Sequence, residues 1–317
     1  MSVLIIIEST EGKLNKGAFE ICTYGHKTAQ VLGGDCNALI LGHAENASDV
    51  GLYGVKNAYQ ISVGDFDSKV YTQIIASAAT KLNADTIIFR HNSTAKNVAG
   101  RLAIRLEAGL VSGAKSVPQL TANGLSVDKS VYSGKAIATY EIGSTQKIIT
   151  VMGNTIQPEI IGAKISLSSI DIDIPSSTTK VVDRKTMSGT VPLPEAERVV
   201  SAGRGMKGPE NWAIIEELAA ELNATTACSR PVADAHWRPH HEHVGQTGVA
   251  IRPNLYFAIG ISGAIQHLAG VNSSKTIVVI NKDPEAPFFK AADYGVVGDL
   301  FEVVPKLTEA IRRMKQH

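Results

Sequence analysis

The feature that most constrains the fold is an alternation of short apolar runs with longer amphipathic segments in the first half of the chain. Three compact runs have the aliphatic composition of buried strands, at Val3–Ile7, Asn37–Leu41 and Thr86–Phe89. Apolar residues at helical spacing predict helices over Gly17–Val31, Ser68–Leu82 and Ala95–Leu106. Strands that alternate with helices favour right-handed βαβ units around a mainly parallel sheet.

Two later segments interrupt this pattern. Between Ser130 and Thr150, the runs "VYSGKAIATYEI" and "KIITVM" predict strands without clear helices between them, so we expect a small antiparallel addition to the sheet. The segment Asp173–Glu197 collects proline, serine, threonine and charge, which is typical of an interdomain linker. We therefore predict an N-terminal α/β domain over residues 1–190 and a C-terminal domain over residues 191–317.

The alternation of strands and helices resumes after the linker. A helix after Gly208 is well signalled, because Pro209 suits a first helical turn and apolar residues share one face, at Trp212, Ile215, Ala219 and Leu222. A C-terminal helix is expected from about Pro305. The prediction for the whole chain is an α/β protein with two doubly wound parallel-sheet domains.

Composition excludes several classes of partner. The net charge of +1 offers no broad attraction to nucleic acid, and aromatic residues are scarce at 5%. Three cysteines without a C-x-x-C pair favour a reducing compartment. The opening run "MSVLIIIEST" is typical of a strand rather than a signal peptide, and no apolar stretch approaches the roughly 20 residues that span a bilayer. We expect a cytoplasmic protein that neither inserts into a membrane nor binds nucleic acid.

Three loops of the second domain are candidates for a ligand site, because open α/β sheets bind ligands beyond the carboxyl ends of their strands. They are Ser201–Met206, Gly260–His267 and Ile280–Pro287. In the second loop, glycines would allow a ligand close to the backbone, and Ser262 could cap a helix whose free N–H groups attract phosphate. The spacings G-x-S-x-G and G-x-G-x-x-G are both absent, which disfavours a nucleophilic serine and a standard nicotinamide site.

The stretch "DAHWRPHHEHVGQTG" raises the question of a metal, because it holds four of the nine histidines, His236, His240, His241 and His243. The first two are four residues apart, but Pro239 between them opposes a regular helix. No cysteine partner and no H-E-x-x-H spacing is present. We interpret the stretch as a histidine-rich loop without a metal. A hydrolase that uses Ser262, or a metal enzyme that uses this loop, is the alternative class.

The second domain resembles a known family. "LYFAIGISGAIQHLAGVNSSKTIVVINKDPEAPFFKAADYGVVGDLFEVVPKLTEAI" is similar to the C-terminal signature of electron transfer flavoprotein alpha subunits. The similarity extends upstream through "VGQTG", "CSRPVADA" and "SAGRGMKGPENW", so it covers about residues 198 to 315. The first half fits the nucleotide-binding-like first domain of that family in its pattern.

The resemblance implies that the second domain is Rossmann-like and binds FAD, with no catalytic residue of its own. It places Arg230 against the flavin ring, the Thr247 hydroxyl at flavin N5, and His267 at the pyrimidine carbonyl. Arg204, Asn281, Asp299 and Leu300 would contact the ribityl, phosphate or adenosine parts. The full set of implied FAD-binding residues is Arg204, Ser229, Arg230, Val244, Gly245, Gln246, Thr247, Ser262, Gly263, Ala264, Ile265, Gln266, His267, Asn281, Asp299 and Leu300.

These residue types suit a flavin that carries single electrons, because a nearby cation and hydrogen-bond donors stabilise the arriving negative charge. Arginine keeps its charge where lysine could lose it. Simpler interpretations exist: Arg230 as a surface ion-pair partner, His267 as a satisfied histidine on a short helix, and Thr247 as a turn residue. The family tends to have glycine where this chain has His236, which is a departure in the histidine-rich loop.

The resemblance also implies a function. The chain would be the alpha subunit of a heterodimer with a separate beta subunit. It would carry electrons from acyl-CoA dehydrogenases of fatty acid β-oxidation, and from other flavin dehydrogenases, to a membrane quinone oxidoreductase. It would convert no substrate of its own. The alternative within the family is an electron-bifurcating, NADH-linked flavoprotein, whose determinants lie largely on the beta subunit.

Overall fold

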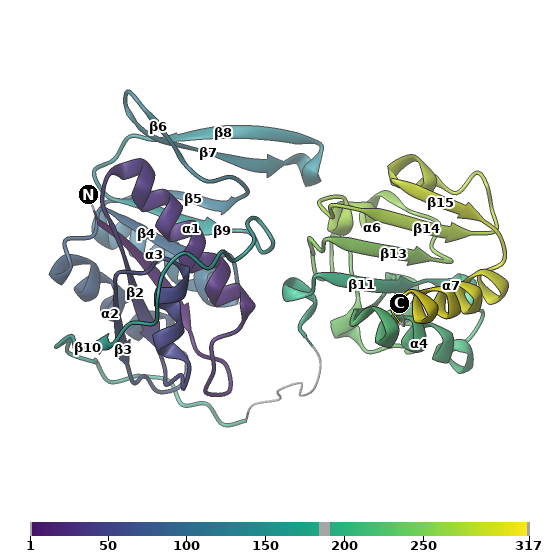
Figure 1. The fold of residues 1–317 in the computed structure, drawn as a ribbon, viewed down its shortest axis with the longest axis horizontal. Coiled ribbons are helices and arrows are strands. Elements are labelled where there is room, and N and C mark those ends of the chain that lie inside the picture. The colour runs from purple at the N-terminus through teal and green to yellow at the C-terminus, as the bar shows by residue number, and fades with distance from the viewer. Residues whose placement is uncertain (1, 184–190, 316–317) are drawn as a thin grey trace. The chain divides into compact units, whose positions relative to one another are not determined.

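The computed structural model describes residues 2–183 and 191–315 (Figure 1). The chain divides into two compact units, residues 1–185 and 186–317. The predicted domain boundary at residue 190 lies outside the described residues, and so does the middle of the predicted linker. Both units combine helices with a sheet rich in parallel strands, which confirms the α/β class. No described helix has the length and apolar character that crossing a membrane requires.

A ten-stranded sheet forms the centre of the first unit (Figure 1). Seven strands run parallel in the order β10-β3-β2-β1-β4-β9-β5, and β7 then pairs antiparallel with β5, β6 and β8. The strands are β1 Ser2–Glu8, β2 Asp35–Leu41, β3 Asn57–Ile61, β4 Thr86–Arg90, β5 Gly109–Ala114, β6 Gln119–Thr121, β7 Gly124–Val131, β8 Ala136–Ile142, β9 Lys147–Val151 and β10 Leu167–Ser168.

Three helices cover this sheet, α1 Lys16–Leu32, α2 Ser68–Lys81 and α3 Ser93–Leu106. Each begins after an Asn or Asp whose side chain accepts a hydrogen bond from the first turn, namely Asn15, Asp67 and Asn92. α1 belongs to the core on one face, and α2 and α3 belong to the core on the other. Short 3₁₀ helices complete the unit, at η1 Ala47–Tyr53 and η2 Tyr132–Gly134.

The antiparallel addition consists of β6, β7 and β8, of which only β8 lies wholly within the predicted segment Ser130–Thr150, and the prediction for "KIITVM" was wrong. That run forms β9, which pairs parallel with both β4 and β5 inside the main sheet. Ile148, Ile149 and Val151 are buried there. An almost continuous apolar run is the pattern of a strand that is covered on both faces, which explains why β9 takes an interior position.

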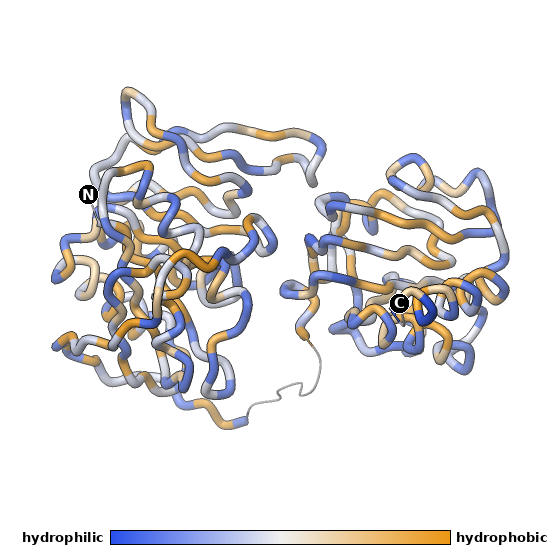
Figure 2. The backbone as a smooth tube through the Cα atoms, in the orientation of Figure 1, coloured by the Kyte–Doolittle hydropathy of each residue, from blue (hydrophilic) through white to orange (hydrophobic). Residues whose placement is uncertain are grey.

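The second unit has a five-stranded, all-parallel sheet in the order β12-β11-β13-β14-β15. Apolar residues line the central strands, and polar ones gather in the connecting loops (Figure 2). Helices α4 and α7 pack together on one core, and α6 and η7 contribute to the other. The strands are β11 Arg198–Ala202, β12 Thr225–Cys228, β13 Leu255–Ile259, β14 Ile277–Asn281 and β15 Tyr294–Val297, and the helices are α4 Ala213–Leu222, α5 Arg230–Asp234, α6 Ile265–Val271, α7 Leu300–Met314, η3 Leu193–Glu195, η4 Arg204–Met206, η5 Pro209–Asn211, η6 His240–Glu242 and η7 Pro287–Ala291.

Two helix boundaries differ from the predictions. Pro209 begins the 3₁₀ turn η5, and α4 itself starts four residues later, with Trp212, Ile215 and Ala219 buried as expected. α7 begins at Leu300 rather than near Pro305, because the Asp299 side chain caps it by accepting from the Phe301 N–H at 2.9 Å. Pro305 therefore lies inside the helix, where it removes one backbone donor.

The described ends of the predicted linker are each anchored to one unit. Asp67 caps α2 and also accepts from the Ser177 hydroxyl at 2.7 Å and the Thr179 hydroxyl at 3.3 Å. On the far side, the Thr225 hydroxyl donates to the Val191 carbonyl at 2.9 Å, and Leu193 is buried. The Ser and Thr residues that suggested a linker thus form specific contacts near its ends.

Helix α6 packs against the loop that contains "VGQTG" through a contact between two glycines. A Cβ on Gly270 would lie 2.5 Å from the Gly245 Cα, which is shorter than any real contact of this kind. By contrast, Gly100 is exposed in α3, and a Cβ there would meet no atom within 4 Å. Gly270 and Gly100 both lie in helices, but only Gly270 is at a position where a side chain has no room.

We predict opposite effects of alanine at these positions. Gly270→Ala should lower the free energy of unfolding by about 1–3 kcal/mol, because backbone must move to admit the methyl group. Gly100→Ala should raise it by about 0.5–1 kcal/mol through lower conformational entropy of the unfolded chain. Differential scanning calorimetry measures both changes. A Gly270→Ala protein as stable as the parent would contradict the close packing of α6 on the loop.

Candidate functional site

A pocket of about 780 Å³ opens at the carboxyl edge of the second sheet. Its lining residues follow every strand of that sheet, from Arg204 after β11 to Leu300 after β15. The chain continues from β11 to β12 on one side and to β13, β14 and β15 on the other, so the strand order reverses between β11 and β13. Ligands of open α/β sheets bind at such a point. The volume is in the range of pockets that hold cofactors and drug-sized ligands.

Glycines bring the turns after β11 and β13 into direct contact. The Gly205 N–H donates to the Gly260 carbonyl at 3.1 Å, and the Gly203 N–H donates to the Ile259 carbonyl at 3.0 Å. Gly260 has φ +59°, and a Cβ on it would lie 2.9 Å from the Gly205 Cα. A side chain at this junction would force the two turns apart.

The structure brings almost all the predicted site residues to this pocket. Gly263 and Ile265 do not line it; Gly263 has φ +87° with the Phe288 backbone directly behind it, and the Ile265 side chain is exposed. The predicted residues that do line it are Arg204, Ser229, Arg230, Val244, Gly245, Gln246, Thr247, Ser262, Ala264, Gln266, His267, Asn281, Asp299 and Leu300.

Ser262 does not cap a helix as predicted. α6 starts at Ile265, its N-cap is Ala264, and no side chain accepts a hydrogen bond from its first turn. Gly263 interrupts the path because a residue with positive φ cannot begin a right-handed helix. Ser262 instead lies in the irregular connection between β13 and α6, and its carbonyl accepts from the Phe288 N–H at 3.1 Å.

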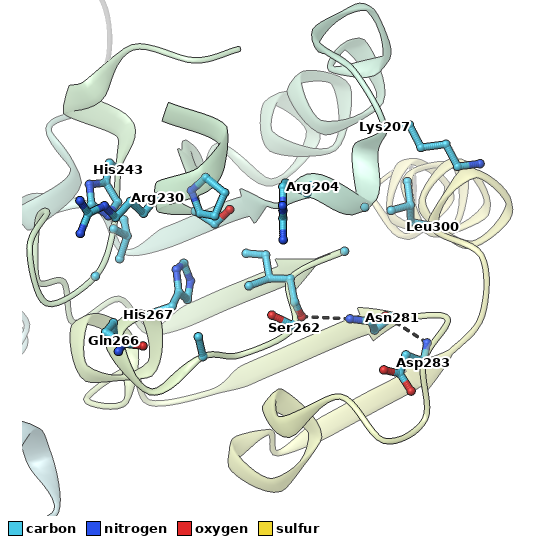
Figure 3. Close-up of a pocket in the computed structure, with 18 of the residues that line it drawn as sticks. Arg204, Lys207, Arg230, His243, Ser262, Gln266, His267, Asn281, Asp283 and Leu300 are labelled. Atoms are coloured by element: carbon cyan, nitrogen blue, oxygen red, sulfur yellow. Dashed lines mark hydrogen bonds between the residues drawn. The ribbon is translucent and has the colours of Figure 1, made fainter. Parts of the chain in front are cut away.

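Asn281 and Asp299 serve the loops that they belong to. The Asn281 side chain donates to the Ile261 carbonyl at 3.0 Å and accepts from the Asp283 N–H at 3.0 Å, which ties the turn after β14 to the turn after β13 (Figure 3). Asp299 caps α7. Both residues therefore shape the pocket wall, whatever else they contact.

Arg230 is the first residue of α5, and it lies with His243 and His267 at one end of the pocket (Figure 3). Its Nε lies 3.3 Å from the Asp234 carboxylate, one helical turn on, and the arginine side chain is 63% exposed. The surface ion pair considered from sequence thus exists, and the same arginine lines the pocket. Asp234 orders the arginine, which leaves it no evident acid–base role.

The histidine-rich loop is held by Arg238. Its guanidinium forms two hydrogen bonds with Glu242 at 2.9 and 2.7 Å, a third with Glu216 at 2.7 Å, and lies over the Trp212 ring. His236 has φ +56°, the left-handed conformation that glycine adopts most easily, which explains why glycine suits this position. Among the described residues, no group of three or more His, Cys, Asp or Glu could hold a metal ion.

His267 lies at the start of α6, almost fully buried. Its Nε2 is 2.7 Å from the Tyr256 hydroxyl on β13, and its Nδ1 is buried without a hydrogen bond. Burial, assisted by His243, lowers the pKa of His267 to about 4, so its ring is neutral near pH 7. A neutral ring with one unpartnered polar nitrogen is suited to a hydrogen bond with a ligand.

The FAD-binding residues implied by the resemblance omit eight lining residues. Five of these belong to the three loops proposed as ligand sites, namely Gly205, Gly260, Ile261, Lys282 and Asp283, and sequence reasoning missed only Lys207, Pro231 and His243. His243 was noticed only as part of the histidine-rich loop. The residue directly precedes "VGQTG", and this position was the signal for its place beside Arg230. Burial lowers the pKa of His243, and the nearby Arg230 lowers it further.

The pocket has the chemistry that a flavin dinucleotide needs. Its four basic residues, Arg204, Lys207, Arg230 and Lys282, outnumber its two acidic ones, Asp283 and Asp299, which favours a ligand with two phosphates. The glycine turns let a ligand approach the backbone. The buried Nδ1 of His267 has no hydrogen-bond partner in the protein, so a ligand can supply one. These residues fit FAD.

Burial of His267 predicts a specific pH dependence of stability. The folded pKa of about 4 lies below the ordinary 6.5, so the unfolded chain binds more protons between these values. The neutral ring therefore contributes to the free energy of unfolding, fully above about pH 6.5, and this contribution is lost as the pH falls through 4. The loss is at most about 3 kcal/mol. His267→Gln should flatten this slope, while the exposed His241→Gln should not.

Urea unfolding between pH 4 and 7 measures the effect. Both tryptophans of the chain, Trp212 and Trp237, belong to the second unit, so their fluorescence reports the unfolding of that unit. Equal slopes in His267→Gln and the parent protein would mean that this histidine titrates normally.

Comparisons with known proteins cover both units. A family model described as the electron transfer flavoprotein domain matches residues 3–175. A second, described as the electron transfer flavoprotein FAD-binding domain, matches residues 192–272. The second match contains the turns after β11, β12 and β13, which form most of the pocket.

Relatives match along almost the whole chain. Electron transfer flavoprotein subunit alpha of Bacillus subtilis (strain 168) is 37% identical over 99% of this chain and 98% of the relative. The proteins of the same name from Thermoanaerobacterium thermosaccharolyticum and Paracoccus denitrificans are 36% and 35% identical over 99% and 97% of this chain, and over 98% and 99% of the relatives. FAD is therefore the cofactor, and the chain belongs to the electron transfer flavoprotein alpha-subunit family.

Proposed function

We propose that this chain, as one subunit of a heterodimer, holds FAD in the pocket of a Rossmann-like second domain and carries electrons between other redox proteins. One observation carries the proposal most directly. All five loops at the carboxyl edge of the second sheet converge on one pocket, and its lining includes a cation, a neutral buried histidine and glycine turns. When bound, FAD would supply the one-electron redox chemistry that no protein side chain in the pocket provides.

The residues at one end of the pocket would hold the isoalloxazine. Arg230, Gln266 and His267 lie together there, and Gln246 and Thr247 belong to the adjoining loop (Figure 3). Arg230 supplies a fixed positive charge near the ring, and the histidine Nδ1 and the Thr247 hydroxyl are potential donors. Such groups favour a ring that becomes more negative, and so they favour acceptance of an electron.

The residues at the other end would hold the diphosphate and adenosine. Leu300 and Lys207 lie there, with Arg204 between them and the ring end (Figure 3). Lys207 also lies over the Phe301 ring, with its Nζ 4.9 Å from the centroid, so α7 supports it. Charge at this end and donors at the ring end suit the two halves of a flavin dinucleotide.

We infer that the electrons come from acyl-CoA dehydrogenases and related flavin dehydrogenases and pass to a membrane quinone oxidoreductase. The pocket supports a carrier rather than a hydrolase, because Ser262 has no histidine or carboxylate hydrogen bond among the described contacts. The test is reduction of the purified FAD-loaded heterodimer by an acyl-CoA dehydrogenase and its substrate, followed by the flavin absorbance. Failure of that reduction, with rapid reduction by NADH, would favour an electron-bifurcating relative.

Arg230→Ala should make the midpoint potential of the first electron more negative. Its loss removes a positive charge from the ring end, but the side chain is well exposed and paired with Asp234, so the shift should be tens of millivolts. Arg230→Lys should retain part of the effect because the charge survives without the planar fork. Spectroelectrochemical titration compares the three proteins with FAD fully bound.

The matched control for Arg230 is Arg313→Ala. Arg313 pairs with Glu309 at the same spacing along a helix, but it lies on α7 outside the pocket lining. Its removal should leave the midpoint potentials of the first and second electrons of the flavin unchanged. An unaltered first potential in Arg230→Ala would place the arginine away from the flavin.

The beta subunit should be required for stable FAD binding. The pocket is lined by one unit of this chain, and several lining residues, among them Arg204, Gln246 and Thr247, are exposed, so a partner is needed to cover the cofactor. Coexpressed with its beta subunit, the chain should elute from size-exclusion chromatography as a yellow heterodimer. A stable, fully FAD-loaded monomer would contradict this expectation.

A further inference from the structure

The hydroxyl of Tyr256 contacts one of the residues that line the pocket. Tyr256 is fully buried on β13, and its oxygen lies 2.7 Å from Nε2 of His267. The Phe288 ring lies beside both rings, with its centroid 6.3 Å from that of Tyr256 and 5.7 Å from that of His267. This packing leaves the imidazole little room to turn.

Both members of the pair are neutral near pH 7. Burial raises the pKa of Tyr256, so its hydroxyl keeps its proton. Burial lowers the pKa of His267, so its ring carries a single N–H. The pair therefore has two possible arrangements: either the hydroxyl donates to Nε2, or an Nε2–H donates to the hydroxyl oxygen.

The surroundings favour the first arrangement. Ser201 lies on the neighbouring strand β11, on the same face of the sheet as Tyr256, and its buried hydroxyl has no hydrogen-bond partner of standard geometry. If Ser201 donates to the Tyr256 oxygen, the Tyr256 proton is directed to Nε2.

We propose that Tyr256 is a positioning residue, which donates to Nε2 of His267 and holds the ring as the tautomer with its proton on Nδ1. The buried Nδ1, which makes no hydrogen bond within the protein, is then a donor for an acceptor atom of the ligand. Only this last step, toward the flavin carbonyl, rests on the proposed function. The tautomer itself follows from contacts within the chain.

The tautomer can be measured by ¹⁵N–¹H correlation NMR on the heterodimer, with ¹⁵N-histidine in this chain alone. The His267 signals are assigned by their absence in His267→Gln. The parent should show one tautomer, with the proton on Nδ1. Tyr256→Phe keeps the ring and removes the donor, so the proton should move toward Nε2. Tyr294→Phe is the matched control, because Tyr294 is exposed on β15 and does not line the pocket.

FAD affinity supplies a second readout. Tyr256→Phe should weaken FAD binding about tenfold, and it should add little in a protein that already carries His267→Gln, because the tyrosine acts through the histidine. A proton on Nε2 in the parent, or an unchanged tautomer in Tyr256→Phe, would overturn the proposal. A parent heterodimer that binds no FAD would instead overturn the proposed function.

Discussion

The second unit depends on the contact between the turns that follow β11 and β13. A pocket opens at the carboxyl ends of two adjacent parallel strands where their chains leave in opposite directions, and here the two turns are so close that a side chain between them would force them apart. Gly203, Gly205 and Gly260 allow this close approach, since their backbones approach within hydrogen-bond distance. The loops after the other three strands then close around the opening, and their positions follow from this junction.

The pocket combines rigid and charged parts in a way that suits electron transfer. Its histidines are buried and their pKa values are lowered, so they contribute donors rather than charge near pH 7. Permanent charge comes from Arg230, which is exposed and held by a carboxylate. This separation of neutral donors from permanent charge suits a redox centre, because a charge that does not titrate contributes the same shift to the midpoint potential at every pH.

Much of the fold and the site could be predicted from sequence, and the errors share a physical origin. The strand–helix alternation predicted the parallel sheets, and the family-like motifs named residues that the fold gathers at one edge, such as Arg204 and His267. Local patterns could not show that β9 pairs inside the sheet, because pairing is a long-range choice. They also could not show that Gly263 adopts a positive φ, which delays α6 and removes the cap from Ser262.

All the described residues that line the pocket belong to the second unit, and this confines the thermodynamic benefit of the cofactor. By mass action, a ligand present at 100 times its dissociation constant stabilises the state that binds it by about 2.7 kcal/mol. That free energy acts on the unit whose five loops it joins and leaves the intrinsic stability of the other unit unaltered. Loss of FAD would therefore lower the free energy of unfolding of the second unit and not that of the first. A shortage of the cofactor would expose the second unit to unfolding and proteolysis first.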